Sequence, residues 1–466
     1  MKTEDVLKLT APPFPTIAVL ILSLFFSINP LSAQTSLKAQ TLTLSEAVET
    51  ALKNNPRLDS MVRAVLQAEY LHAAAVKDRL PVLSTQYAFA GFAKRPELRF
   101  SSGEIEELDI RGEELSFPLS ERSSFAWSTH VKMPLYTGFA LEAQQSIAHL
   151  GISVSEWKLL EAKADLIQEV TLNYLSVLRA EDYLEVAAQN LARFRRHERI
   201  TSKFYKVGLT AKNTLLEIQV RRANAQQDLI VAKKNVKLTK AVLNVGMGVD
   251  VDASYRLEKI PPIRQTGLSL PESARLAKAH NPTLVAFTYL KERAEKVVEL
   301  EKTQGRPKVS FDLSFTRHGK TAEVNGGDHL SNNIFAAMIV GDWEVFDWFK
   351  TKDRAQARRK DLEILLNDHK RAEDQVSLDI RESFLSLESA RHKLKAAEQE
   401  IQYAQENYRI TRQRYEEQVA PSTEVNDALV LLKQAHFNHT GALYEYHTAL
   451  AKLERITGTN LKRRGE

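Results

Sequence analysis

The chain has 466 residues, of which 43% are hydrophobic, 26% are charged and none is cysteine, and its formal net charge is +5. This length is ample for a buried core, and the lack of cysteine excludes disulfides, thiolate nucleophiles and cysteine-metal sites. It also excludes a lipidated N-terminal cysteine, so we expect no acyl anchor. The basic residues form no block along the sequence, which argues against nucleic acid as a partner.

The N-terminal segment has the pattern of a secretion signal. Lys2 and Lys8 precede an apolar run at 17–26, and the sequence Leu-Ser-Ala follows at 31–33. Such a run rises about 15 Å as a helix, roughly half of a hydrocarbon core, so a cleavable signal peptide at 1–33 is favoured over a membrane anchor. No later segment is apolar over the ~18 residues of a spanning helix, so a membrane position would require a barrel.

The sequence contains an internal duplication. Residues 42–92 match residues 268–318 at a constant offset, and residues 125–248 match residues 335–458 without a gap. Chance similarity between amphipathic helices supplies some apolar pairs, but not an ungapped match of this length. We therefore predict two structural repeats with one blueprint, which span residues 34–248 and 249–466.

Each repeat is predicted to open with a short helix. A hydroxyl residue stands three positions before a glutamate, Thr43 in the first repeat and Ser269 in the second, as in a capping box. The Asn-Pro pairs at 55–56 and 281–282 end this helix, because proline lacks an amide and biases its predecessor away from αR. A second helix is expected after each pair.

Two segments in each repeat alternate apolar and polar residues, which predicts strands. We expect these strands at about 82–92, 124–135, 308–317 and 333–345. About ten residues cross a bilayer when tilted, with apolar side chains toward lipid and polar side chains toward a wet lumen. Half-buried strands of a soluble sheet are the alternative. The polar loop at 93–123 suits either the extracellular rim of a barrel or a solvated loop without a role.

Helices of unusual length are predicted after the strands. No proline interrupts residues 140–205, and apolar residues recur at spacings of three, four or seven, as in a coiled coil. A shorter helix at 212–245 returns and completes a hairpin. The second repeat has the same pattern at 353–415 and 423–456.

Four strands cannot close a membrane barrel around a lumen, since the smallest membrane barrels need about eight. One copy alone would expose unpaired backbone amides to lipid, at a cost of several kcal/mol each. Several copies must therefore share one barrel. The physical argument permits two, three or more.

The order of these elements, given twice, resembles the TolC family of outer-membrane efflux proteins. The most specific matching segments are residues 44–48, 53–58, 134–138 and 205–210. The resemblance covers nearly all of the mature chain. It implies a mainly α fold with a small β part, in which three copies share a 12-stranded barrel and an α-helical periplasmic tunnel.

The same resemblance implies an exit duct in the outer membrane that extends into the periplasm. It would passively conduct substrates in a tripartite efflux or type I secretion system. The implied partners are two further copies of the chain, outer-membrane lipid, a periplasmic adaptor and, through the adaptor, an inner-membrane pump. No nucleic acid, cofactor or metal is implied, and we expect no enzymatic activity. The alternative is a periplasmic adaptor or coiled-coil scaffold without a membrane barrel.

The resemblance also implies two groups of functional residues. Asp427 aligns with a pore-facing aspartate of the family, and its equivalent Glu217 and the neighbouring Glu424 are expected beside it at a constriction. Ordinary solvated charges on helix faces are the alternative for these carboxylates. The periplasmic tips, expected to contact the adaptor, are Val207, Gly208, Leu209, Thr210, Val419, Ala420, Pro421 and Ser422.

Three residues of the second repeat depart from the family pattern. Gln418 replaces the tip glycine, Trp348 stands where a glycine is usual at the junction of strand and helix, and Glu344 stands where the first repeat has Pro134. These departures put the turn at the second tip, and its contact with an adaptor, in question.

Overall fold

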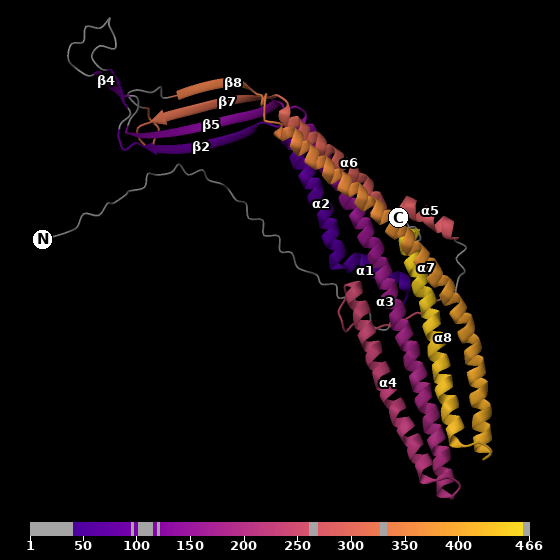
Figure 1. The fold of residues 1–466 in the computed structure, drawn as a ribbon. Helices are drawn as coiled ribbons and strands as arrows, with labels where there is room; N and C mark the ends of the chain where they lie inside the picture. The colour runs from indigo at the N-terminus through magenta and orange to yellow at the C-terminus, as the bar shows by residue number, and fades with distance from the viewer. Residues whose placement is uncertain are drawn as a thin grey trace, which may run out of the picture.

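The computed structural model describes residues 41–94, 97–100, 115–118, 122–260, 269–326 and 333–459. The structure has a four-stranded sheet, which lies at one end of a long body of helices (Figure 1). The signal peptide expected at 1–33 and most of the polar loop at 93–123 lie outside the described residues. The boundaries of the two repeats, 34–248 and 249–466, stay a prediction.

The two repeats have helices of matching length. Helix α1 (Leu44–Asn54) and helix α5 (Leu270–His280) both have 11 residues, and α2 (Pro56–Lys77) and α6 (Pro282–Lys302) follow them. The long helices α3 (Ala140–Lys206) and α7 (Lys350–Glu416) both have 67 residues. The returning helices are α4 (Lys212–Met247) and α8 (Ser422–Ile456). The predicted duplicated, mainly α fold is confirmed.

The residues predicted to start and stop the short helices do so. Thr43 accepts a hydrogen bond from the Glu46 amide at 3.1 Å, and its own amide donates to Glu46 Oε2 at 2.8 Å. Asn55 and Asn281 end the first helix and cap the next. Their side-chain amides also donate to Gly246 O at 3.0 Å and Ile456 O at 3.2 Å. Each Asn-Pro pair therefore ties the short helices to the end of the returning helix.

The sheet joins the two repeats. Strands β2 (Val82–Gly91), β5 (Ser123–Tyr136), β7 (Lys308–Gly319) and β8 (Asn333–Asp342) are antiparallel in the order β2-β5-β7-β8. The contact between β5 and β7 pairs the first repeat with the second. Strands β2 and β8 each have one neighbour among the described residues and form the two edges of the sheet.

The strand register sorts the side chains onto two faces. Directly opposed residues share a face, so Tyr87, Trp127 and Arg317 lie in one row, as do Thr85, Thr129 and Phe315. The alternate rows are polar, as in the set Ser84, His130 and Ser314. The sheet therefore has one face rich in aromatic and aliphatic side chains and an opposite face, here called the polar face. The polar face is polar along β5 and β7, whereas β8 contributes apolar residues such as Met338 and Val340 to it.

Two further pairs of short strands were not foreseen from the sequence. Strand β1 (Thr41–Leu42) pairs in parallel with β6 (Arg256–Leu257), and the buried hydroxyl of Tyr174 lies within hydrogen-bond distance of the carbonyls of Leu42 and Glu258, at 2.9 and 2.7 Å. This clamp holds the connection between the repeats against α3. Strands β3 (Glu97–Phe100) and β4 (Leu115–Pro118) form a hairpin inside the polar loop.

The helices pack in a fixed order. Near the sheet, α3 packs against α2 and α6, and α6 packs against α7. Away from the sheet, α3 packs against α4 and α8, and α8 packs against α7 (Figure 1). The largest buried cluster lies around the middle of α3, where Val170, Tyr174 and Val177 meet Leu243 and Met247 of α4.

Left-handed backbone marks the same positions in both repeats. Gly208 has a φ of 78° and its equivalent Gln418 has a φ of 64°. The second tip therefore adopts the turn of the first without a glycine. A side chain in this region costs about 1–2 kcal/mol, so the second turn is strained.

This strain can be tested at the two tips. Gln418→Gly is expected to stabilise the second turn by about 1 kcal/mol, since it removes the strain. The matched exchange Gly208→Gln is expected to destabilise the first turn by a similar amount, although no atom would crowd a Cβ there. Hydrogen exchange of the turn amides measures both changes. If the turn amides of both variants were protected to the same extent as in the wild type, the second turn would not be strained.

Candidate functional site

The expected adaptor-contacting residues gather at the end of the molecule opposite the sheet (Figure 1). Val207, Leu209 and Val419 are exposed to 68%, 57% and 66%. Gly208 and Pro421 are also exposed, and Thr210 is half-buried. Ala420 and Ser422 are buried within the chain. The surface offered at the tips is therefore small and apolar.

Polar contacts between buried side chains join the two hairpins just above the tips. His197 Nε2 of α3 lies 3.0 Å from Ser422 Oγ at the start of α8. Thr201 Oγ1 of α3 lies 2.8 Å from the Tyr415 hydroxyl of α7, and the rings of His197 and Tyr415 meet edge to face. Burial lowers the pKa of His197 to about 4. The histidine is therefore neutral near pH 7, and Ser422 serves the packing between the hairpins.

The three carboxylates expected at a constriction lie in the first two turns of the returning helices. Asp427 of α8 is exposed and makes no ion pair or hydrogen bond within the described part of the chain. Glu424 pairs with Arg414 at 3.3 Å. Glu217 of α4 accepts a hydrogen bond from Asn426 Nδ2 at 3.2 Å. The structure thus brings the acidic residues of both repeats to the same level, with Asp427 the one that lacks a partner among them.

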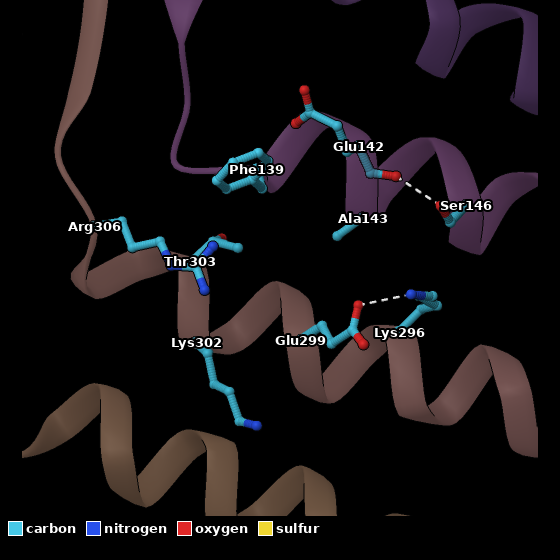
Figure 2. Close-up of a pocket in the computed structure, with 9 residues that line it drawn as sticks. All are labelled: Phe139, Glu142, Ala143, Ser146, Lys296, Glu299, Lys302, Thr303 and Arg306. Carbon is cyan, nitrogen blue, oxygen red and sulfur yellow. Dashed lines mark hydrogen bonds and ion pairs between the residues drawn. The ribbon is translucent and has the colours of Figure 1, made fainter.

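A shallow groove of about 450 Å³ lies at the opposite end, where the strands meet the helices (Figure 2). Arg306 donates a hydrogen bond to Gly138 O at 3.1 Å, and a Cβ on Gly138 would lie 2.6 Å from the Cβ of Arg306. This contact explains the junction glycine of the first repeat. Lys296 and Glu299, both on α6, pair along one wall of the groove at 2.8 Å. The groove lies at the junction between the sheet and the helices, far from the tips.

The junction of strand and helix in the second repeat forms the same turn with different residues. Trp348 and Phe349 adopt left-handed backbone, with φ of 52° and 64°, as Gly138 and Phe139 do in the first repeat. Trp348 is 83% exposed, so its side chain meets no obstacle like Arg306. Glu344 pairs with Lys350 at 3.0 Å at the start of α7. The left-handed turn is thus the same in both repeats, although β8 ends at Asp342, before Glu344, whereas β5 continues through Pro134 to Tyr136.

The described ranges contain neither a metal-binding cluster nor a membrane-spanning helix. No group of three or more acidic or histidine side chains is placed to hold a metal ion. In the same residues, no helix is both long enough and apolar enough to cross a membrane.

A sheet with lipid-length strands, joined to two helical hairpins whose longer helices are about 100 Å long, defines a class of channel proteins with a periplasmic helical extension. A family model described as "Outer membrane efflux protein" matches residues 47–249 and 274–459. The chain belongs to the outer membrane efflux protein family. It is thus an outer-membrane channel protein that reaches into the periplasm, and not the adaptor or scaffold kept as the alternative.

Individual relatives are distant in sequence. The alkaline protease secretion protein AprF of Pseudomonas aeruginosa is 21% identical over 66% of this chain, and the match spans 64% of AprF. The solved outer-membrane channel OprN has a TM-score of 0.72 at 15% identity, with 89% of each chain covered. The Campylobacter jejuni CmeC outer membrane channel has a TM-score of 0.73 at 14% identity, covering 90% of this chain and 88% of CmeC. These structures share the fold.

The depressed pKa of His197 predicts a pH-dependent contact between the hairpins. An unfolded histidine titrates near 6.5, so the stabilisation is complete above pH 6.5 and is lost as pH falls toward 4. The loss over this window should be about 2–3 kcal/mol. Hydrogen exchange of the amides at 423–429 measures it between pH 4 and 7.5. His197→Gln keeps a hydrogen-bonding side chain without a titrating ring, and an identical pH dependence in this variant would refute the assignment.

Proposed function

We propose that three copies of this chain join head to tail to form an exit duct, with a shared barrel in the outer membrane and a helical tunnel in the periplasm. The support is that each layer of the molecule ends in the same way. The sheet is bounded by β2 and β8. The layer of helices near the sheet is bounded by α2 and α7, and the layer away from the sheet by α4 and α7. A first-repeat element always forms one edge and a second-repeat element the other.

Such edges suit a closed ring. If β8 of one copy pairs with β2 of the next, the same rotation brings α7 of that copy to α2 and α4 of its neighbour. Three copies then give twelve strands, which is enough to enclose a wet lumen. The exposed apolar side chains on α4 suit burial by α7 of the neighbouring copy; they are Leu216, Val220, Ile230, Val231, Leu238, Val242 and Val245.

The tips would contact a helical hairpin of a periplasmic adaptor, which connects the duct to an inner-membrane pump. Support comes from the exposed aliphatic residues Val207, Leu209 and Val419, which no described part of the chain covers. The rest of the proposed contact surface is Gly208, Thr210 and Pro421. Ala420 and Ser422 would act indirectly, because they are buried and hold the turn in place. The duct would serve tripartite efflux or type I secretion and conduct passively.

Asp427 would form the constriction, repeated in each of the three copies. Three like charges close together repel one another and attract cations, so contacts that separate them would favour opening. Glu424 and Glu217 would contribute less to this field, since Arg414 and Asn426 already contact them.

Channel recordings in planar bilayers test this proposal. Purified wild-type protein is expected to form small, cation-selective channels. Asp427→Ala should raise the single-channel conductance, because the shorter side chain widens the constriction, and should lower the cation selectivity, because the cation-attracting carboxylates are removed. Glu424→Gln changes an ion-paired carboxylate and should have a smaller effect on both quantities. No channel activity would count against the duct, whereas an unchanged Asp427→Ala channel would remove only Asp427 from the constriction.

A further inference from the structure

The first hairpin carries a stripe of cations that its own chain leaves without ionic partners. The stripe consists of Arg195, Arg196, Arg199, Lys203 and Lys206, all exposed on α3. Arg195 and Arg196 are adjacent, and the following steps of three, four and three residues keep all five on one side of the helix. Of the five, Arg195 donates a hydrogen bond to neutral Gln226 at 3.2 Å. Within the described residues none forms an ion pair with a carboxylate.

The equivalent positions of the second hairpin are almost neutral, and the duplication makes this a controlled comparison. They hold Gln405, Glu406, Arg409, Gln413 and Glu416. There Arg409 pairs with Glu406 at 2.7 Å, and Glu416 pairs with Arg412 at 3.5 Å.

The contrast extends over both hairpins. Residues 193–240 hold 13 basic and 3 acidic residues, whereas the equivalent residues 403–450 hold 4 basic and 6 acidic ones. The three acids of the first hairpin are already engaged by other groups: Glu198 by Arg222, Glu217 by Arg221 and Asn426, and Asp228 by Lys433. They cannot neutralise the stripe.

Folding alone gives no reason for such a stripe. Like charges three or four residues apart destabilise a helix, and the second hairpin has the same helix without them. A partner that binds only the folded protein would compensate for the repulsion. Lipid of the outer membrane is out of reach, because α3 rises about 80 Å between its start at Ala140 and Arg195.

The stripe leads directly to the exposed apolar tip. Lys206 is followed by Val207 and Leu209, which are exposed to 68% and 57%. The cationic stripe and the apolar tip at its end are together complementary to a helix that has acidic residues along its length and apolar residues at its end.

We propose that the first hairpin docks an acidic α-helical hairpin of the periplasmic adaptor through Arg195, Arg196, Arg199, Lys203 and Lys206, and that the second hairpin meets a surface of lower negative charge. The inference rests on the proposed adaptor contact at the tips. It adds that the two hairpins of each copy are distinct binding surfaces, which an adaptor distinguishes by charge.

Synthetic helical hairpins that differ only in their exposed residues test the charge preference. Three versions carry glutamate, glutamine or lysine on one face and the same apolar loop, and their binding to the full-length trimer in nanodiscs is followed by fluorescence anisotropy. The glutamate version is expected to bind at least tenfold more tightly than the glutamine version at 50 mM NaCl. At 300 mM NaCl this advantage should largely disappear, since salt screens exposed charges.

Paired variants with equal net charge locate the binding surface. Arg195→Gln with Lys203→Gln removes two charges from the stripe and should weaken binding of the glutamate hairpin about tenfold. Gln405→Glu with Gln413→Glu changes the net charge by the same amount at the equivalent positions and should alter binding less than twofold. All four positions are exposed, so neither pair should disturb the fold.

The outcomes separate this inference from the docking proposal. Equal weakening by both pairs, or equal binding of the glutamate and glutamine hairpins, would overturn the charge inference while leaving docking at the tips intact. If no hairpin bound, the docking proposal would fail as well. Equally tight, stripe-dependent binding of phosphatidylglycerol vesicles would show a general anion surface and also overturn the inference.

Discussion

The unpaired backbone at the two edges of the sheet is the constraint on which the assembly depends. In lipid each free amide or carbonyl costs several kcal/mol, so β2 and β8 must be paired wherever the sheet crosses a membrane. The fold cannot satisfy this within one chain, because β5 and β7 separate the two edge strands. Pairing between copies satisfies the backbone, and the same rotation covers the outer faces of α4 and α7. The periplasmic tunnel therefore follows from the same requirement as the barrel.

Much of this architecture could be predicted from the duplication. Elements that need no tertiary context, such as the capping box at Thr43 and the stop at Asn55, lie where the sequence predicts them. The clamp of Tyr174 on Leu42 and Glu258 could not be foreseen, because it joins residues far apart in the chain through backbone carbonyls. The hairpin of β3 and β4 was also missed, since its strands are short and lie in a charged loop.

At the candidate site, the sequence located the tips and the acidic residues but not their surroundings. The contact of His197 with Ser422 depends on how α3 packs against α8, so Ser422 was expected on the surface and is buried. The cationic stripe was missed for a related reason. Arg195 and Arg196 are adjacent, but uncharged or acidic residues separate this pair from Arg199, Lys203 and Lys206. Only the helix brings all five to one side. The two repeats thus share a scaffold while their surfaces have diverged.

Pairing of β2 with β8 between copies is the central claim, and disulfide trapping tests it most directly, since the chain has no cysteine of its own. One cysteine is placed at Ala88 in β2, and a second at Ala336, Met338 or Val340 in β8, all on the polar face of the sheet. The account predicts that one combination, oxidised in membranes, gives covalent trimers on a denaturing gel. Exclusively monomeric products for every combination would contradict it.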